Sequence, residues 1–171
     1  SYMVDDKTGY IRLSRFGATT MGEFRDAVSK LINENGMQNL ILDLQSNGGG
    51  YLTAATELSD EFLDKDKLIV YMEGENQPRN NDFATAKGMF EKGELVVLVD
   101  EGSASGSEIV AGAVQDWDRG VIVGRRTFGK GLVQRQFPLP DGSMIRLTVA
   151  RYYTPTGRSI QKPYENGGQD A

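Results

Sequence analysis

The chain has 171 residues, of which 39% are hydrophobic and 25% charged, and its formal net charge is −5 at pH 7. This composition is typical of a single soluble globular domain, and the acidic balance argues against nucleic acid as a partner, because phosphates attract basic surfaces. The chain contains no histidine and no cysteine; zinc and thiol chemistry therefore lose their usual ligands, and we expect neither a metal nor another cofactor.

Predicted strands and helices alternate along the chain, which indicates an α/β fold. Because the strands at 40–44 and 95–99 are continuously apolar, we expect a mostly parallel sheet flanked by helices. The other predicted strands are 9–13, 68–71, 121–123 and a hairpin of 132–137 with 144–152. The predicted helices begin near Thr20, where Glu23 completes a capping box, near Thr53, at Phe83 and at Ser105. The polar stretch 74–81 is predicted to be an exposed loop, 83–90 a helix, and 162–171 a frayed tail of the single domain 1–171.

Three glycines follow the apolar strand 40–44, in the order Ser46-Asn47-Gly48-Gly49-Gly50. The carboxyl ends of strands are where α/β sheets present their ligand sites. Backbone N–H groups at such glycines can approach a ligand closely, as an oxyanion hole requires. A tight turn between a strand and a helix is the alternative, and this segment alone does not decide between the two.

Three serines, Ser103, Ser105 and Ser107, follow the apolar strand 95–99 and open a predicted helix. A serine at a helix N-terminus lies in the positive end of the helix dipole, which favours developing negative charge. Ser105 and Glu108 also have the spacing of a capping box, so a helix cap is the alternative. Since the chain lacks histidine and cysteine, a serine nucleophile needs lysine as its base.

Lys130 lies between two glycines, 25 positions after Ser105. The segment 124–131 comes close to the phosphate-binding pattern G-x-x-x-x-G-K-[ST], but Gly131 stands where that pattern needs a hydroxyl. The residues that follow predict a strand and not the helix whose N-terminus binds the phosphate. We therefore disfavour nucleotide binding, and a solvated surface lysine is the alternative to a catalytic one.

Four segments, in order, resemble the carboxyl-terminal processing (tail-specific) serine proteases, and together they extend over nearly the whole chain. The resemblance implies the ClpP/crotonase-like protease core of that family, here without the PDZ domain that normally precedes it. The segments 42–50, 97–113, 123–134 and 146–161 resemble the family's glycine-rich oxyanion loop, nucleophile segment, lysine segment and closing strand.

The resemblance implies a Ser-Lys dyad. Ser105 corresponds to the nucleophile and Lys130 to the general base, and Gln134, four positions later on the same strand, orients the lysine. A free lysine has a pKa near ~10.4 and is protonated at neutral pH. We expect burial beside Phe128 and Gly129 to lower the pKa of Lys130, so that it can accept the serine proton and then protonate the leaving amine.

The remaining implied roles concern the oxyanion hole and one acidic residue. The amide of Gly106 and one from Gly48 or Gly49 correspond to the oxyanion donors. Asp116 matches an acidic position that some family members need, and a salt bridge on the helix face is an equal interpretation.

The resemblance further implies a bacterial serine endopeptidase that cleaves proteins or peptides chosen by extended, unstructured C-terminal tails. It implies an exported location, in the periplasm or cell envelope, and a full-length protein with a PDZ domain and a possible membrane association. Two alternatives stay open. One is a catalytically silent core that binds extended peptides; the other is a crotonase-like acyl-CoA enzyme, for which we find neither an acidic pair nor a CoA groove.

Overall fold

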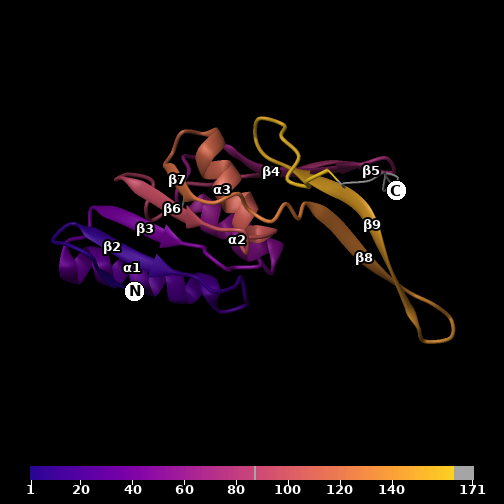
Figure 1. The fold of residues 1–171 in the computed structure, drawn as a ribbon, viewed down its shortest axis with the longest axis horizontal. Coiled ribbons are helices and arrows are strands. Elements are labelled where there is room, and N and C mark those ends of the chain that lie inside the picture. Colours follow the sequence, from indigo (N-terminus) through magenta and orange to yellow (C-terminus); the bar gives the residue numbers. More distant parts are fainter. Residues whose placement is uncertain (87, 164–171) are drawn as a thin grey trace.

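The computed structural model describes residues 1–86 and 88–163, which form two β-sheets and the helices packed against them (Figure 1). The first sheet has five strands, all parallel except its edge strand β1. In sheet order these are β1 (Tyr2–Met3), β2 (Thr8–Arg12), β3 (Asn39–Asp43), β6 (Leu95–Val99) and β7 (Val121–Gly124). The helices are α1 (Thr20–Asn35), α2 (Leu52–Asp60) and α3 (Gly106–Asp116).

One face of the first sheet carries the main core. Side chains alternate across a strand, so Leu40 and Leu42 of β3 share a face with their partners Leu95 and Val97 of β6. All four are buried, and they belong to one apolar cluster with residues of α1, α2 and α3. The intervening Ile41 is only half-buried. The helices therefore pack against the face of the sheet that carries Leu40, Leu42, Leu95 and Val97.

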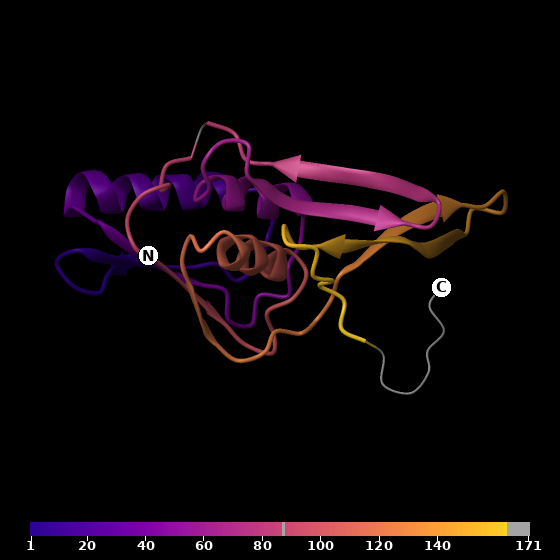
Figure 2. The same cartoon turned by 90° about the horizontal axis from the view of Figure 1, so that it is seen from above.

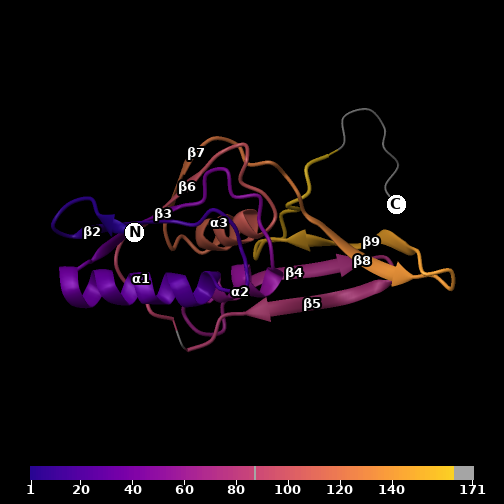
Figure 3. The ribbon, with the colours of Figure 1, turned by 90° about the horizontal axis from the view of Figure 1, so that it is seen from below.

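The second sheet is antiparallel, and its strands extend beyond the helices. In sheet order they are β5 (Gln77–Phe83), β4 (Leu68–Gly74), β9 (Met144–Tyr153) and β8 (Leu132–Pro138). Seen from above, the β4–β5 and β8–β9 hairpins project to the same side (Figure 2). The view from below shows the β8–β9 hairpin as an arm at the end of the molecule (Figure 3). Its exposed apolar side chains are Phe137, Leu139, Met144, Ile145 and Leu147.

The prediction of an exposed loop at 74–81 is wrong, because residues 77–83 form the edge strand β5, which pairs with β4. The pattern misled because an edge strand faces solvent and tolerates polar residues and proline, here Pro78. Its partner strand supplies the side-chain contact, since the guanidinium of Arg79 lies 3.6 Å from the ring centroid of Tyr71.

The helix predicted at 83–90 does not form in the described residues of that segment. Its polar groups bond to the end of α2 and not to one another. The Thr85 hydroxyl donates to Asp60 Oδ2 at 2.7 Å, and the Met89 amide donates to Glu61 Oε2 at 2.8 Å. A helix would have to give up these tertiary hydrogen bonds.

The capping box predicted at Thr20 is also wrong. Thr20 is the first residue of α1, and its Oγ1 accepts a hydrogen bond from the Gly17 amide at 2.9 Å.

Of the frayed tail predicted at 162–171, residues 164–171 lie outside the described part of the chain. Lys162 is held, since its amide donates to Gly129 O at 3.1 Å.

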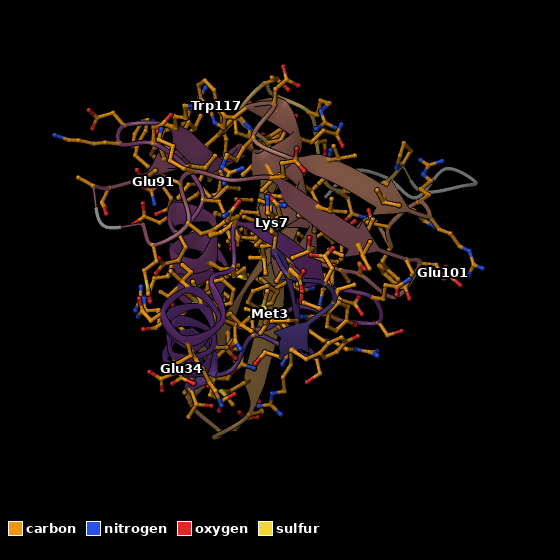
Figure 4. All side chains as sticks on the ribbon, turned by 90° about the vertical axis from the view of Figure 1, so that its left-hand side faces the viewer. Met3, Lys7, Glu34, Glu91, Glu101 and Trp117 are labelled. Atoms are coloured by element: carbon orange, nitrogen blue, oxygen red, sulfur yellow. The ribbon has the colours of Figure 1, made fainter. Side chains whose placement is uncertain are left out.

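No helix among the described residues is long and apolar enough to cross a membrane. Acidic side chains such as Glu34 and Glu101 lie at the periphery of the molecule in the end-on view (Figure 4), and both are exposed.

Candidate active site

The glycine loop (residues 46–50) and the serine turn (residues 102–107) lie side by side because they follow neighbouring parallel strands. β3 pairs with β6 up to Asp43 and Leu98, and both segments leave the same edge of the sheet. The Ala104 amide donates to Asn47 O at 3.0 Å. A Cβ at Gly49 would lie 2.8 Å from Ser105 Cβ, so only glycine permits this approach. The two segments predicted to carry the chemistry are thus in contact.

Ser105 adopts a strained backbone conformation at the start of α3. Its φ of 52° and ψ of −108° lie in a region that L-residues rarely occupy. Strain of this kind, at a serine between a strand and a helix, is typical of a nucleophile elbow, where the turn projects the hydroxyl from the backbone. Ser105 is half-buried.

The two flanking serines are structural. Ser103 Oγ donates to Leu44 O and Ser107 Oγ donates to Asn47 O, each at 2.8 Å. Both side chains are fully buried. These bonds attach the serine turn to Leu44 and to the glycine loop, on either side of Ser105.

The backbone amides of Gly106, directly after the serine, and of Gly48 have no acceptor within the described part of the chain. The Gly50 amide also has none, but Gly50 lies against Phe16. The Gly49 amide is occupied, since it donates to Asn47 Oδ1 at 2.9 Å. Of the two glycines left open by the sequence, Gly48 therefore has the free donor. A pair of unpaired amides next to a serine is what an oxyanion hole needs.

The side chains of Asn47 and Asp100 hold the glycine loop in place by hydrogen bonds to backbone groups. Asn47 is fully buried, and its Nδ2 donates to Leu13 O at 2.8 Å. Asp100 accepts hydrogen bonds from the amides of Ser46 at 2.8 Å and Gly102 at 2.9 Å, and so links the loop to the serine turn. The Ser46 amide, with help from Gly102, holds the pKa of Asp100 below its usual range.

Glu108 joins the serine turn to the lysine segment (residues 125–131). Its buried carboxylate accepts hydrogen bonds from three backbone amides: Ser105 at 2.9 Å, Gly129 at 2.6 Å and Lys130 at 2.8 Å. Oε2 serves both Ser105 and Lys130, so their backbone nitrogens are within about 6 Å of each other. The capping pattern predicted the bond with Ser105, whereas no pattern along the chain predicted the bonds with Gly129 and Lys130.

The side chain of Lys130 does not have the burial that we expected. Lys130 and Phe128 are exposed, and within the described residues the Lys130 ammonium makes no hydrogen bond or ion pair. No hydrogen bond joins it to Ser105. Gln134 is likewise exposed, at a β-bulge of β8, whereas Lys130 precedes that strand and is not on it. The structure brings the backbones of the proposed dyad together, but within the described residues its side chains are not hydrogen-bonded to each other.

Asp116 lies at the opposite end of α3 from Ser105. It accepts hydrogen bonds from the amide of Thr156 at 2.9 Å and its hydroxyl at 2.7 Å, and it pairs with Arg158. Burial acts to raise the pKa of Asp116, but these hydrogen bonds hold it below its ordinary value. Asp116 therefore fixes the turn after β9 and contacts neither Ser105 nor Lys130.

In the part of the chain that is described, no group of three or more acidic side chains gathers that could hold a metal ion. The chemistry that the site offers is that of a serine hydroxyl, two free amides and a nearby lysine.

Comparison with known proteins places this geometry in a family. The model of peptidase family S41 matches residues 7–167. The chloroplastic C-terminal processing peptidase of Tetradesmus obliquus is 40% identical over 154 residues, which cover 90% of this chain and 33% of that protein. The carboxy-terminal-processing protease of Bartonella bacilliformis is 40% identical over 164 residues, which cover 94% of this chain and 38% of that protein.

The solved structure of the photosystem II D1 C-terminal processing protease superposes with a TM-score of 0.85 at 39% identity, over 90% of this chain and 39% of that one. The expected α/β fold with a mostly parallel sheet is confirmed.

This chain spans about a third of the length of the curated relatives it matches. These relatives include chloroplast as well as bacterial proteins, so the similarity does not single out bacteria. The chain belongs to peptidase family S41, and the relatives named above are carboxyl-terminal processing proteases.

Proposed function

We propose that this chain is the core of a serine endopeptidase in which Ser105 attacks the peptide carbonyl and Lys130 is the general base. The observation that carries the proposal is the shared carboxylate of Glu108, which binds the amides of both residues. A lysine side chain extends about 6 Å from its Cα, a reach comparable with the separation of the two backbones. Since Lys130 has no other partner among the described residues, rotation of its side chain costs no existing contact.

In the proposed reaction, neutral Lys130 Nζ takes the proton from Ser105 Oγ as Oγ bonds to the carbonyl carbon. The amides of Gly106 and Gly48 stabilise the oxyanion. When the C–N bond breaks, the Lys130 ammonium returns its proton to the leaving amine, and an acyl-enzyme remains. Water then attacks the ester with Lys130 again as base, which releases the acid and restores the serine. A substrate lying over Lys130 would bury it and favour its neutral form.

Gln134 and Asp116 support the lysine in this proposal. Gln134 is exposed and has no side-chain hydrogen bond in the described structure, and in this proposal it orients the Lys130 ammonium once a substrate is bound. Asp116 acts at a distance, through the turn that it holds at Thr156 and Arg158.

The substrates that we propose are proteins or peptides with extended, unstructured C-terminal tails. Support comes from the names of the relatives, which are carboxyl-terminal processing peptidases. We also propose an exported setting, consistent with the chloroplast and bacterial relatives, and selection of the tail by a PDZ domain in the longer protein.

The test is cleavage of an unstructured protein, fluorescein-labelled casein, by the wild type, Ser105→Ala and Lys130→Ala. We expect each variant to lose about 10⁴-fold or more in turnover, because the residues of a nucleophile–base pair act as a unit. Both variants should unfold at the wild-type temperature, as should the matched controls Ser14→Ala and Lys65→Ala, which alter exposed residues without hydrogen bonds.

Turnover at the wild-type rate in Ser105→Ala or Lys130→Ala ends the dyad proposal. A wild type that binds casein without cleaving it supports the alternative of a catalytically silent, peptide-binding core.

A further inference from the structure

The segment after β9 crosses the backbone on both sides of Lys130. We call residues 159–162 the strap. The Lys162 amide donates to Gly129 O at 3.1 Å, and Gln161 Oε1 accepts a hydrogen bond from the Gly131 amide at 3.0 Å. The strap itself is joined to the second sheet, where the Ile160 amide donates to Tyr152 O at 3.1 Å.

The two glycines around Lys130 are explained by the strap. A Cβ at Gly131 would lie 2.4 Å from the Gln161 amide nitrogen, and a Cβ at Gly129 would lie 2.7 Å from Lys162 Cβ. Contacts this close exclude any side chain at either position. The Gly-Lys-Gly sequence is therefore shaped by the approach of the strap and not by a bound phosphate.

The backbone of Lys130 is thus held from two directions. From α3, Glu108 accepts the amides of Gly129 and Lys130; from the other direction, the strap binds Gly129 O and the Gly131 amide. The Lys130 side chain itself is exposed and without a partner in the described structure. These backbone contacts fix the Cα from which that side chain extends.

One contact in this arrangement depends on a single side chain that no catalytic role explains. We propose that Gln161 is a positioning residue for Lys130. Its Oε1 accepts the Gly131 amide and so fixes the peptide group that follows Lys130, the residue from which the lysine side chain extends. Its Nε2 donates to Lys162 O at 3.2 Å, which fixes the amide to its own strap. This inference rests on the proposed function, because it requires Lys130 to be the base.

The far end of the strap is anchored independently. Ser159 bridges to Tyr153, and the preceding Thr156 and Arg158 bind Asp116 of α3. Removal of the Gln161 side chain should therefore loosen the lysine segment locally and leave the strap attached.

The experiment compares Gln161→Met, which has a similar volume but no acceptor, with Gln161→Glu, which keeps an oxygen for the Gly131 amide. Gln136→Met is the matched control, since Gln136 is exposed on β8 and has no side-chain hydrogen bond. We expect the kcat for casein to fall about tenfold in Gln161→Met, with KM unchanged, as the loss of one positioning hydrogen bond predicts. Gln161→Glu should keep most of the wild-type kcat.

A hydrogen-exchange measurement on the Gly131 amide accompanies the kinetics, and exchange should be faster in Gln161→Met than in Gln161→Glu. If Gln161→Met does not fold, Gln161→Asn replaces it in the experiment, because the asparagine side chain is too short for its oxygen to reach the Gly131 amide.

Equal kcat in Gln161→Met and Gln136→Met overturns the inference and leaves the proposed function intact. Loss of kcat in Gln161→Met and Gln161→Glu alike, together with a lower unfolding temperature, also overturns it, because the role is then structural. A wild type that does not cleave casein, or cleavage that survives Lys130→Ala, overturns the proposed function and this inference with it.

Discussion

The serine turn is buried on both sides of Ser105, whereas the lysine segment lies at the surface from Arg125 to Lys130, with only Thr127 and Gly129 partly covered. In the serine turn, side chains provide the attachment, through the hydroxyls of Ser103 and Ser107. In the lysine segment, backbone amides and carbonyls provide the attachment from Phe128 to Gly131, and the Arg125 side chain pairs with Glu101 at 3.2 Å. The two regions meet at the carboxylate of Glu108 and at a backbone hydrogen bond from the Phe128 amide to Ser103 O at 3.0 Å.

The difference shows how the two halves of a proposed dyad can be controlled separately. The core fixes the nucleophile together with its strained backbone, and such strain persists only where the surroundings determine the conformation. The lysine has a fixed backbone but a free side chain, so its position is the part that substrate, or a partner, can still change. Three predictions probe this contrast, in order of expected effect.

Glu108→Gln should have the largest effect because it acts on both regions at once. The carboxylate accepts three amides, and a glutamine offers one oxygen and turns an NH2 group toward N–H donors. Buried donors left unsatisfied should lower the free energy of unfolding by about 2 to 3 kcal/mol. Casein turnover should fall by about a hundredfold or more, a loss of roughly 3 kcal/mol in transition-state stabilisation.

Glu23→Gln on the exposed face of α1 is the control for this substitution. If Glu108→Gln matched that control in both turnover and unfolding temperature, the two regions would not be coupled through Glu108.

Asp100→Asn should have an intermediate effect, confined to the serine side and dependent on pH. The folded-state pKa of Asp100 is lowered, chiefly by the Ser46 amide. Its contribution to stability is therefore fully present above the ordinary aspartate pKa of about 3.9, and it is lost as pH falls through the folded-state value. We expect the wild type to unfold at a higher temperature than Asp100→Asn at pH 6, and the difference to shrink below about pH 4.

Unfolding temperatures measured from pH 2 to pH 7 check this, with Asp26→Asn as an exposed control. A difference between wild type and Asp100→Asn that stays constant over that range would contradict the role of the ionised carboxylate.

Gly106→Ala should have the smallest effect. The new Cβ would lie 3.0 Å from Phe16 Cδ2 and 3.2 Å from Ala55 Cβ, which is tight but not prohibitive. We expect a loss of about 1 kcal/mol in stability from this crowding, and turnover within a few-fold of wild type, because the backbone amide remains. Gly22→Ala, where the Cβ would meet nothing within 4 Å, is the control for crowding. A hundredfold loss of turnover in a folded Gly106→Ala would argue against a backbone oxyanion donor there.

The most apolar strands and the helix after the serine turn were predictable, whereas the second sheet was predictable only in part. Leu95–Val99 and Gly106–Asp116 form where the apolar pattern placed them, because a buried strand or helix face must be apolar. The edge strand β5 has no such requirement, since pairing with β4 alone defines it. Residues 83–90 show the same limit, because bonds to Asp60 and Glu61 replaced those of a helix.

The same distinction holds within the site. Ser105, Gly48 and Gly106 could be proposed from the sequence, because the segments that carry them resemble those of the carboxyl-terminal processing proteases. The choice of Gly48 over Gly49 could not, since it depends on Asn47 occupying one of the two amides. Nor could the exposure of Lys130, which depends on what packs around the segment and not on its neighbours in sequence.

The alternation of strands and helices and the two small-residue segments at the strand ends follow from the amino-acid sequence alone. So does the lack of histidine and cysteine, which leaves lysine as the base for a serine nucleophile. That Glu108 connects Ser105 with Lys130, and that Gln161 reaches Gly131, is visible only in the folded chain. Periodicity and turn chemistry act over a few residues. The bonds from Lys130 to Glu108 and from Gly131 to Gln161 join groups 22 and 30 positions apart, and these groups meet only when the sheet has brought its strand ends together.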